Sequence, residues 1–275
     1  MKATLSLPLL FVACFNTLAA TNDWKLVWSD EFDKPGLPDP ARWSYETGFV
    51  RNNEAQYYTR ERQENARVEN GLLVIEGRKE KFKNPEYAPD KQGRRGQEFA
   101  DYTSASLTTR TKAAWTYGRI EVKAKLPRGR GTWPAIWMLG TNRQAGWPAC
   151  GEIDIMEFVG HDPGLVHANV HTRKYNHKQG NGKGDKLQMP DVSEAFHLYA
   201  MEWHPDRLEF FVDDTHYFTY KNEGSGEDSW PFEKDQYLIL NLALGGAWGG
   251  QQGIDDSIFP QKFCIDYVRV YQKKS

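Results

Sequence analysis

The chain reads Cys-Gly-Glu-Ile-Asp-Ile-Met-Glu-Phe from Cys150 to Phe158, so three acidic residues lie among large apolar ones. As a helix, at about 100° per residue, this segment would spread Glu152, Asp154 and Glu157 around the axis. As a strand, it places Glu152 and Asp154 on one face and the isoleucines on the other. Glu157 then has the wrong parity, unless a β-bulge at Ile155-Met156 adds one residue. The segment therefore predicts a bulged strand with three carboxylates on one side.

Similar strand-like runs recur along the chain, separated by Gly, Pro, Asn and Asp, while amphipathic helices and βαβ spacing are missing. Asp213-Asp214 is typical of a hairpin turn into residues 216–220. Residues 79–101 and 173–190 are predicted as long loops, which can wall a binding cleft. The pattern predicts an all-β sandwich or jelly roll, and no linker divides residues 21–275, so we expect one domain. The runs lie at 72–76, 118–125, 165–171, 196–203, 207–212, 237–243 and 263–271.

The overall composition excludes two classes of protein. Of the 275 residues, 39% are hydrophobic and 26% charged, which is enough apolar surface for a sizeable core and excludes wholesale disorder. The formal net charge of −2 lacks the basic surplus of a generic nucleic-acid binder. Ten tryptophans exceed what such a core needs. They indicate either a Trp-rich core or a surface that stacks on flat ligands such as sugar rings.

The first twenty residues are predicted to be a targeting segment. Lys2 precedes an apolar run too short to span a bilayer, and small residues follow, so residues 1–20 are typical of a secretory signal peptide. Lipid anchoring at Cys14 is the alternative. Either places the mature domain outside the cytoplasm, secreted, periplasmic or anchored at the cell surface. No other segment is long enough for a membrane span. We expect Cys150 and Cys264 to be free buried thiols, with a disulfide between them as the alternative.

The three carboxylates favour acid–base chemistry. With the bulge, Glu152 and Glu157 are about 13 Å apart along the strand, and inward leaning leaves about 5 Å between their carboxyl groups. A retaining glycosidase needs about 5–5.5 Å, whereas an inverting one needs roughly 6.5–9.5 Å. We expect Asp154 to hold a proton or hydrogen bond, to favour ionised Glu152 and to help keep Glu157 protonated. The alternatives are a calcium site and an exposed acidic ladder.

Residues 152–157 resemble the signature of family 16 glycoside hydrolases, in its six-residue, bulged form. The flanking motifs are similar to those of the family's laminarinase-type endo-β-1,3-glucanases, and the resemblance covers essentially the whole mature chain. These motifs are WSDEF at 28–32, NNEAQYYT at 52–59, GTWPAIWMLG at 131–140, LILNLALGGAW at 238–248 and IDYVRVY at 265–271.

The resemblance implies a fold and a mechanism. The fold is a concave jelly roll of two antiparallel sheets, and the reaction is a retaining double displacement without a cofactor. By the same resemblance Glu152 is the nucleophile, Glu157 is the general acid/base and Asp154 is the assisting carboxylate.

Other positions match the family's cleft residues. By the resemblance, Trp133 and Trp137 stack on sugar rings near the cleavage point, and their spacing of four places them on one face of a strand. The alternatives here are core tryptophans and, at Arg110, a structural ion pair. The remaining matches to cleft positions are Arg110, Asn53, His171 and Trp248.

Metal binding is expected at one place only. The resemblance implies a structural calcium on the convex side at Glu31, Gly71 and Asp266, held partly through backbone carbonyls. His167 and His171 have a spacing that mimics a zinc pair, but they lie on a strand without a clear third ligand, so zinc is disfavoured.

The sequence therefore predicts a monomeric endo-β-glucanase that hydrolyses β-1,3-glucans such as laminarin, or mixed β-1,3/1,4-glucans. Its partner is the polysaccharide, with neither nucleic acid nor a membrane span. A non-catalytic glucan-binding lectin is one alternative, although a binding module has no need for the acidic triad. A hydrolase or transglycosylase for another polysaccharide is the other. Sulfated galactans are disfavoured because more Arg and Lys would then be expected in the cleft.

Overall fold

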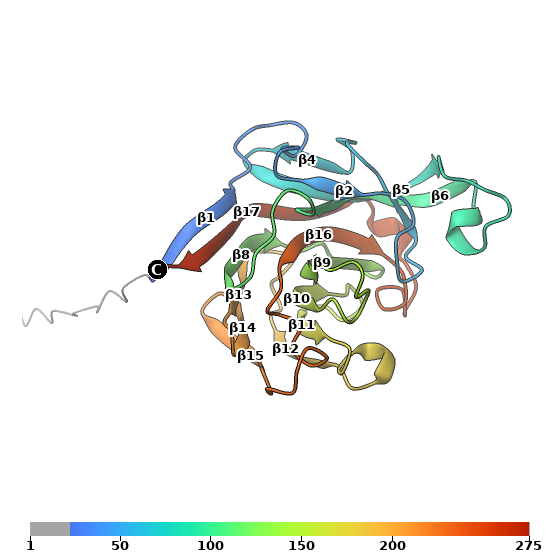
Figure 1. The fold of residues 1–275 in the computed structure, drawn as a ribbon. Coiled ribbons are helices and arrows are strands. Elements are labelled where there is room, and N and C mark those ends of the chain that lie inside the picture. The colour runs from blue at the N-terminus through green and yellow to red at the C-terminus, as the bar shows by residue number, and fades with distance from the viewer. Residues whose placement is uncertain (1–22, 275) are drawn as a thin grey trace, which may run out of the picture.

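The computed structural model describes residues 23–274, whose regular secondary structure consists almost entirely of β-strands (Figure 1). Ten of the described strands form the larger sheet, in the order β15-β14-β13-β8-β17-β5-β6-β3, with β1 beside β17 and β4 beside β5. Their bounds are β1 Trp24–Asp30, β3 Gln56–Tyr58, β4 Ala66–Glu69, β5 Leu72–Lys83, β6 Phe99–Ser104, β8 Gly118–Lys125, β13 His197–Trp203, β14 Arg207–Val212, β15 Thr215–Lys221 and β17 Gln261–Lys273.

Seven further strands form the second sheet, in the order β12-β11-β10-β9-β16-β7-β2. They are β2 Ser44–Glu46, β7 Ser106–Thr108, β9 Thr132–Gly140, β10 Glu152–Phe158, β11 Leu165–His171, β12 Lys183–Gln188 and β16 Gln236–Leu244. Three short 3₁₀ helices lie in the described connections, η1 Gly93–Gly96, η2 His177–Gln179 and η3 Asp256–Ile258. The predicted all-β sandwich of antiparallel sheets is confirmed, apart from one parallel pair, β3 with β6.

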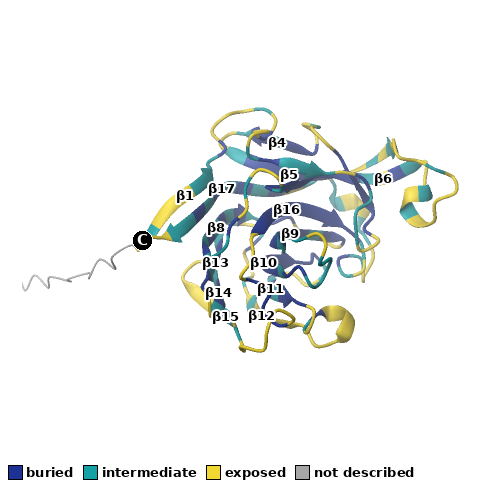
Figure 2. Cartoon of the chain, in the orientation of Figure 1, coloured by how far each residue is buried: buried dark blue, intermediate teal, exposed yellow. Residues whose placement is uncertain are grey.

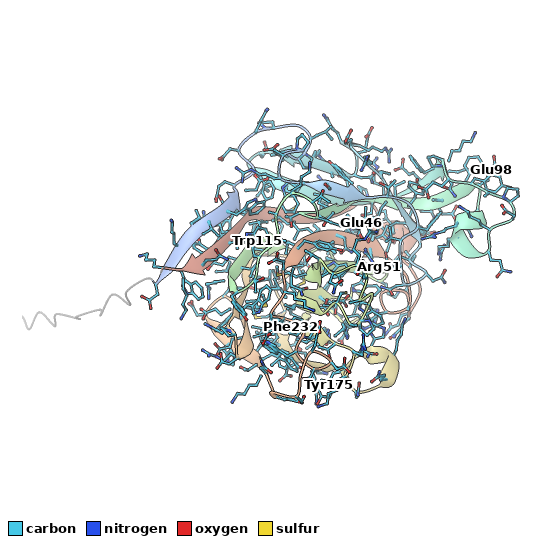
Figure 3. All side chains as sticks on the ribbon, viewed as in Figure 1. Glu46, Arg51, Glu98, Trp115, Tyr175 and Phe232 are labelled. Carbon is cyan, nitrogen blue, oxygen red and sulfur yellow. The ribbon has the colours of Figure 1, made fainter. Side chains whose placement is uncertain are left out.

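The core lies between the two sheets, where their apolar faces meet (Figure 2). In β8 the alternation is regular, and Ile120, Val122 and Ala124 are fully buried while the residues between them are half-exposed. Trp115 and Phe232, from connections between strands, pack into the same core (Figure 3). The opposite face of the smaller sheet carries its own small apolar cluster, which includes Trp137 and Tyr237. This second cluster forms the floor on which the candidate site is built.

Both of the predicted long loops, 79–101 and 173–190, contain strand residues. Residues 79–83 continue β5, and β6 begins at Phe99, so the first loop is shorter than expected. In the second, Lys183–Gln188 forms β12, an edge strand that pairs with β11. Most residues of β12 are exposed, so its polar, Gly- and Lys-containing sequence has no burial alternation from which a strand could be recognised.

Several smaller predictions have a clear outcome. The hairpin at Asp213-Asp214 is confirmed, because it joins β14 to β15. Cys150 and Cys264 are both free, as expected, but only Cys150 is buried and Cys264 is half-buried. No helix within residues 23–274 is long and apolar enough to cross a membrane. The predicted signal peptide and the anchor at Cys14 lie outside the described residues.

Candidate active site

The predicted bulge is present in β10. Between Asp154 and Met156, β10 has one residue more than its neighbour β9, and between Asp154 and Glu157 it has one more than β11. The additional residue is Ile155. Ile155 and Met156 are both fully buried in the core, and Glu157 consequently returns to the face that carries Asp154. The bulge therefore places all three acids on the outer face of the smaller sheet.

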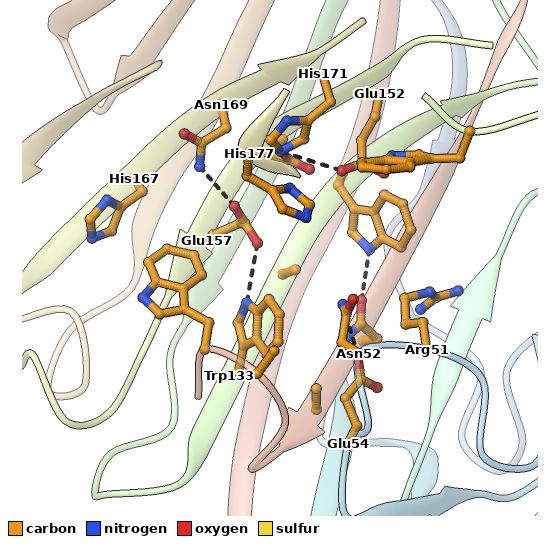
Figure 4. Close-up of a pocket in the computed structure, with 18 of the residues that line it drawn as sticks. Arg51, Asn52, Glu54, Trp133, Glu152, Glu157, His167, Asn169, His171 and His177 are labelled. Atoms are coloured by element: carbon orange, nitrogen blue, oxygen red, sulfur yellow. Dashed lines mark hydrogen bonds and ion pairs between the residues drawn. The ribbon is translucent and has the colours of Figure 1, made fainter. Parts of the chain in front are cut away.

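That face is hollowed into a cleft of about 760 Å³ (Figure 4). Its floor comes from β9, β10, β11 and β16, and loops supply its walls. Glu152, Asp154 and Glu157 all line it. The main side chains around them are Arg51, Asn52, Glu54, Trp133, Trp137, Trp147, His167, Asn169, His171, His177, Asn241 and Trp248.

Glu157 is fixed by two hydrogen-bond donors. The indole Nε1 of Trp133 donates to its Oε1 at 3.1 Å, and the amide Nδ2 of Asn169 donates to its Oε2 at 2.8 Å (Figure 4). Only 9% of Glu157 is exposed. A buried carboxylate is costly unless it is hydrogen-bonded, and these donors provide that compensation.

Glu152 is held in a similar way by a different tryptophan. Trp147 Nε1 donates to Glu152 Oε2 at 3.0 Å. On the other side, His171 Nε2 lies 3.6 Å from Glu152 Oε1 and 3.3 Å from Asp154 Oδ2. Gly151 enters the strand with φ +81°, and a Cβ there would come within 2.8 Å of Pro231, so glycine is required just before the acidic segment.

Burial raises the pKa of all three carboxyl groups. Burial, and then the charge of Asp154, raise the pKa of Glu152 to about 8, although His171 opposes them. The pKa of Asp154 is raised well above its usual range by burial and then by Glu157. Burial also raises the pKa of Glu157, against His171 and its two hydrogen-bond donors. Asp154 was expected to favour the ionised form of Glu152. A charged Asp154 does the opposite, because its charge raises the pKa of Glu152. A protonated Asp154 removes the repulsion.

Arg51 is a cleft residue that the sequence pattern did not single out. Its guanidinium lies 4.8 Å from the ring centre of Trp137 and forms an ion pair with Glu46 (Figure 3). Its Nη1 is buried and has no hydrogen-bond partner. Trp137 itself is only 7% exposed, and its Nε1 donates to Asn241 Oδ1 at 2.7 Å. Arg51 therefore covers much of the ring face that was expected to stack on sugar.

Trp147 and Asn169 were missed as well. Trp147 lies only five residues before Glu152, which is the one sequence signal that could have identified it. Asn169 lies on β11 between His167 and His171, so the alternation of β11 places all three on the cleft face. The two histidines therefore both lie on the floor of the cleft.

The predicted substrate residues divide into two groups. Trp133, Trp137, His171 and Trp248 line the cleft, and the rings of Trp133 and Trp248 meet edge-to-face at 5.6 Å. Asn53 does not line it. Its neighbours Asn52 and Glu54 do. Asn52 and Asn53 are both exposed and both have φ +53°, so the turn directs only one of the two asparagines toward the cleft.

Arg110 also lies outside this cleft, contrary to the expectation. It follows β7, and β16 and β9 separate β7 from β10, so the side chain lines a neighbouring hollow instead. There its guanidinium lies 5.9 Å from the ring centre of Tyr237. The alternative of a structural ion pair is not met either, because no carboxylate in the described chain pairs with Arg110.

At the expected calcium positions, both carboxylates have cationic partners. Arg269 binds Glu31 through two hydrogen bonds of 3.0 and 2.8 Å, and Lys123 Nζ lies 2.9 Å from Asp266. Gly71 forms the turn between β4 and β5 at φ +74°. These side chains fit a cation poorly as they stand, because calcium would have to compete with Arg269 and Lys123 or use backbone carbonyls. Calcium binding stays a prediction.

The chain is similar to known proteins in sequence and in fold. Residues 53–269 match the family described as glycosyl hydrolases family 16. A beta-glucanase from Rhodothermus marinus is 50% identical over 259 residues, covering 90% of this chain and 85% of the relative. A glucan endo-1,3-beta-glucosidase from Cryptopygus antarcticus is 36% identical over 281 residues, covering 95% and 96%. The X-ray structure of the laminarinase from Rhodothermus marinus matches with a TM-score of 0.83 at 48% identity, covering 92% and 98%.

Proposed function

Because the chain belongs to glycoside hydrolase family 16, we propose that it is an endo-β-glucanase that hydrolyses β-1,3-glucan by a retaining double displacement. The observation that carries this proposal is the bulge in β10, which brings Glu152 and Glu157 to one face of a tryptophan-lined cleft. The names of the relatives support the substrate, since both act on glucans. A lectin would gain nothing from three buried carboxyl groups, whose burial costs free energy.

In the first step Glu152 acts as the nucleophile. Its carboxylate oxygen attacks the anomeric carbon while the bond from that carbon to the glycosidic oxygen breaks. Glu157 gives its proton to the departing oxygen, so the released chain leaves as a neutral alcohol. The raised pKa of Glu157 supports this acid role. For Glu152 to be ionised at neutral pH, Asp154 must retain its own proton, in agreement with its strongly raised pKa.

In the second step the roles of the two groups reverse. Glu157, now ionised, accepts a proton from water as the water oxygen attacks the anomeric carbon. The bond to Glu152 breaks and its carboxylate is restored. Two inversions at one carbon give net retention. The hydrogen bonds from Trp133 and Asn169 stabilise the ionised form of Glu157 that this step requires.

The nucleophile is tested by Glu152→Gln, a nearly isosteric change that removes the attacking charge. We expect turnover of laminarin to fall by several orders of magnitude while the circular dichroism spectrum is unchanged. Retention of more than about a tenth of wild-type turnover, a smaller loss than one catalytic group supplies, would show that Glu152 is not the nucleophile.

The two roles are separated by azide rescue. Glu157→Ala should cripple cleavage of glucan but spare the first step on an aryl glycoside, whose leaving group needs little protonation. Azide should then attack the glycosyl-enzyme and give a β-azide, whereas azide rescue of Glu152→Ala should give the α-azide. An α-azide from Glu157→Ala would reverse the assignment.

Linkage preference and location are further parts of the proposal. Comparing laminarin, barley β-glucan, curdlan and agarose in a reducing-sugar assay, with the products sized, tests β-1,3 against mixed-linkage and endo against exo cleavage. The pattern of residues 1–20 supports export of the mature protein from the cytoplasm. N-terminal sequencing of the protein from the medium or periplasm should begin just after Ala19 or Ala20. A lipid-modified Cys14 would instead support the anchored form.

A further inference from the structure

A second hollow, beside the active-site cleft, gathers three cationic side chains. It has a volume of about 420 Å³. Arg110, Lys112 and Arg143 line it, together with Tyr237 and the two threonines Thr111 and Thr141. No acidic residue of the described chain lines this cationic hollow. Since the whole protein has a formal net charge of −2, this local surplus of positive charge runs against the overall balance.

The three cations of the hollow have no acidic partner in the described chain. Within residues 23–274, none of them forms an ion pair with a carboxylate. Arginines elsewhere on the sheets do form such pairs, as Arg119 does with Glu121 and Glu202. Lys112 and Arg143 are exposed, and Arg110 is half-buried over the Tyr237 ring. Their charges therefore remain available to a ligand.

The hollow continues the floor of the active-site cleft. Tyr237 is only 6% exposed and packs in one apolar cluster with Trp137 and the partly buried Leu139. Both Trp137 and Leu139 also line the active-site cleft. Arg51, in the cleft, and Arg110, in the hollow, both act on the pKa of Tyr237, which burial raises and the two cations oppose. The cleft and the hollow therefore lie over adjacent parts of one sheet, since Leu139, which lines the cleft, pairs across β9 and β16 with Tyr237, which lines the hollow.

We propose that the cationic hollow binds an anionic substituent, a carboxylate or a sulfate, on a sugar unit next to those in the catalytic cleft. The inference rests on the proposed glucanase function and specifies its substrate class as glucans that carry some acidic substituents. Guanidinium groups present paired donors that match the oxygens of both anions. The three cations offer only donors, and the side-chain acceptors of the hollow are the hydroxyls of Thr111, Thr141 and Tyr237, so an anion uses the hollow more fully than a neutral sugar does. Three cations in a hollow also attract an anionic chain from solution.

The test compares kcat/KM for laminarin, lightly C6-carboxylated laminarin and lightly sulfated laminarin. The double variant Lys112→Gln/Arg143→Gln removes two exposed charges and leaves Arg110 and the cleft untouched. The matched control Lys25→Gln/Lys221→Gln removes two exposed charges from the larger sheet. We expect the wild type and the control to favour an anionic laminarin about three- to tenfold at low salt, the effect of two or three exposed charge pairs. High salt should diminish this preference.

In the double variant this preference should disappear, while kcat/KM for neutral laminarin stays within about twofold of wild type. A preference for only one of the two substituted laminarins would identify the anion. The inference is overturned if the wild type shows no preference, or if the double variant keeps it. Failure to cut neutral laminarin would contradict the glucanase function instead. In that case, binding tests the hollow separately. The dissociation constants of the three laminarins are measured for Glu152→Gln and for the triple variant that also carries Lys112→Gln and Arg143→Gln. Tighter binding of an anionic laminarin by Glu152→Gln, lost in the triple variant, would support the hollow as the anion site.

Discussion

At the scale of single residues, each catalytic glutamate accepts a hydrogen bond from the indole of a tryptophan that also lines the cleft. Trp133 donates to Glu157 and Trp147 donates to Glu152. The same rings can contact sugar, so substrate binding and carboxylate orientation depend on the same side chains. Trp147 also packs against His177 and lies under the Lys178 ammonium, which holds the indole in place.

Trp133→Phe tests the electrostatic part of this arrangement, because it keeps an aromatic ring and removes only the N–H. The hydrogen bond from Trp133 lowers the pKa of Glu157, so its loss should raise that pKa. We expect the alkaline limb of the kcat/KM profile, which reports the protonated acid of the free enzyme, to move up by about one pH unit.

The matched control for this prediction is Trp248→Phe. The Trp248 ring lies beside Trp133, but no indole N–H of Trp248 bonds to either glutamate. Its alkaline limb should stay where it is in the wild type. Equal shifts in both variants would mean that the shape of the cleft, and not the hydrogen bond from Trp133, sets the position of the alkaline limb.

At the scale of the element, the bulge of β10 is a local insertion that leaves the rest of the strand in register. Asp154 pairs with Trp137, and Met156 pairs with the next residue of β9, so Ile155 alone has no partner on that side. Removing it would give a regular strand with the same pairs on both sides of the gap. Glu157 would still lie on the cleft face, because four regular steps have the same parity as five with a bulge.

We therefore expect deletion of Ile155 to destabilise the protein without abolishing activity. The fully buried Ile155 side chain is lost from the core, which should cost about 2–4 kcal/mol of unfolding free energy. Ile155→Ala, which creates the cavity but keeps the bulge, should cost a similar amount. Urea unfolding and laminarin hydrolysis measure both variants. A complete loss of activity in a folded deletion variant would show that the bulge sets the carboxylate geometry and not just the parity.

At the scale of the whole molecule, the carboxyl cluster should reduce stability at high pH. All three carboxyl groups have raised pKa values, and that of Glu152 rises from 4.5 to about 8, so between these values the folded cluster retains protons that the unfolded chain releases. Stability therefore falls as the pH rises through this window. Glu152→Gln removes this loss and should be more stable than wild type by about 1–3 kcal/mol at pH 9, with little difference near pH 4.

The comparison for this prediction is Glu80→Gln. The pKa of Glu80 is lowered by its hydrogen bond from Arg62, so this variant should lose stability at neutral pH and approach wild type in acid. Urea unfolding at several pH values distinguishes the two directions. A Glu152→Gln variant with the same pH dependence as wild type would mean that Glu152 titrates normally in the fold.

Calcium is a second test at the level of the whole molecule. If Glu31, Gly71 and Asp266 hold a structural calcium, a chelator should lower the melting temperature, because a metal that binds only the folded state stabilises it by mass action. Activity at room temperature should remain, since the site is remote from the triad. A melting temperature that stays constant from no calcium to millimolar calcium would contradict the site. Glu31 and Asp266 would then serve only as the ion-pair partners of Arg269 and Lys123.

The sequence by itself determined the class of the fold, the bulge and the three acids. These depend on local alternation and on parity, which can be counted along one strand. It also indicated a tryptophan-lined cleft, because four of the expected substrate residues lie there. It could not place Arg110 or Asn53, since motif position does not tell how many strands separate two segments in a sheet or which residue of a turn faces inward.

Only the tertiary structure decided the partners and the electrostatics of the acids. Trp147, from the connection between β9 and β10, and Asn169, on β11, reach the carboxylates through the way this connection folds back and the register of β10 against β11, which the alternation of a single strand does not specify. A charged Asp154 raises the pKa of Glu152, so the expected effect requires a protonated Asp154, and the burial that raises the pKa of Asp154 depends on everything that covers the cleft and not on neighbours in sequence. The cationic hollow was also invisible, since residues 110–112, 143 and 237 meet only through the folding of the sheet.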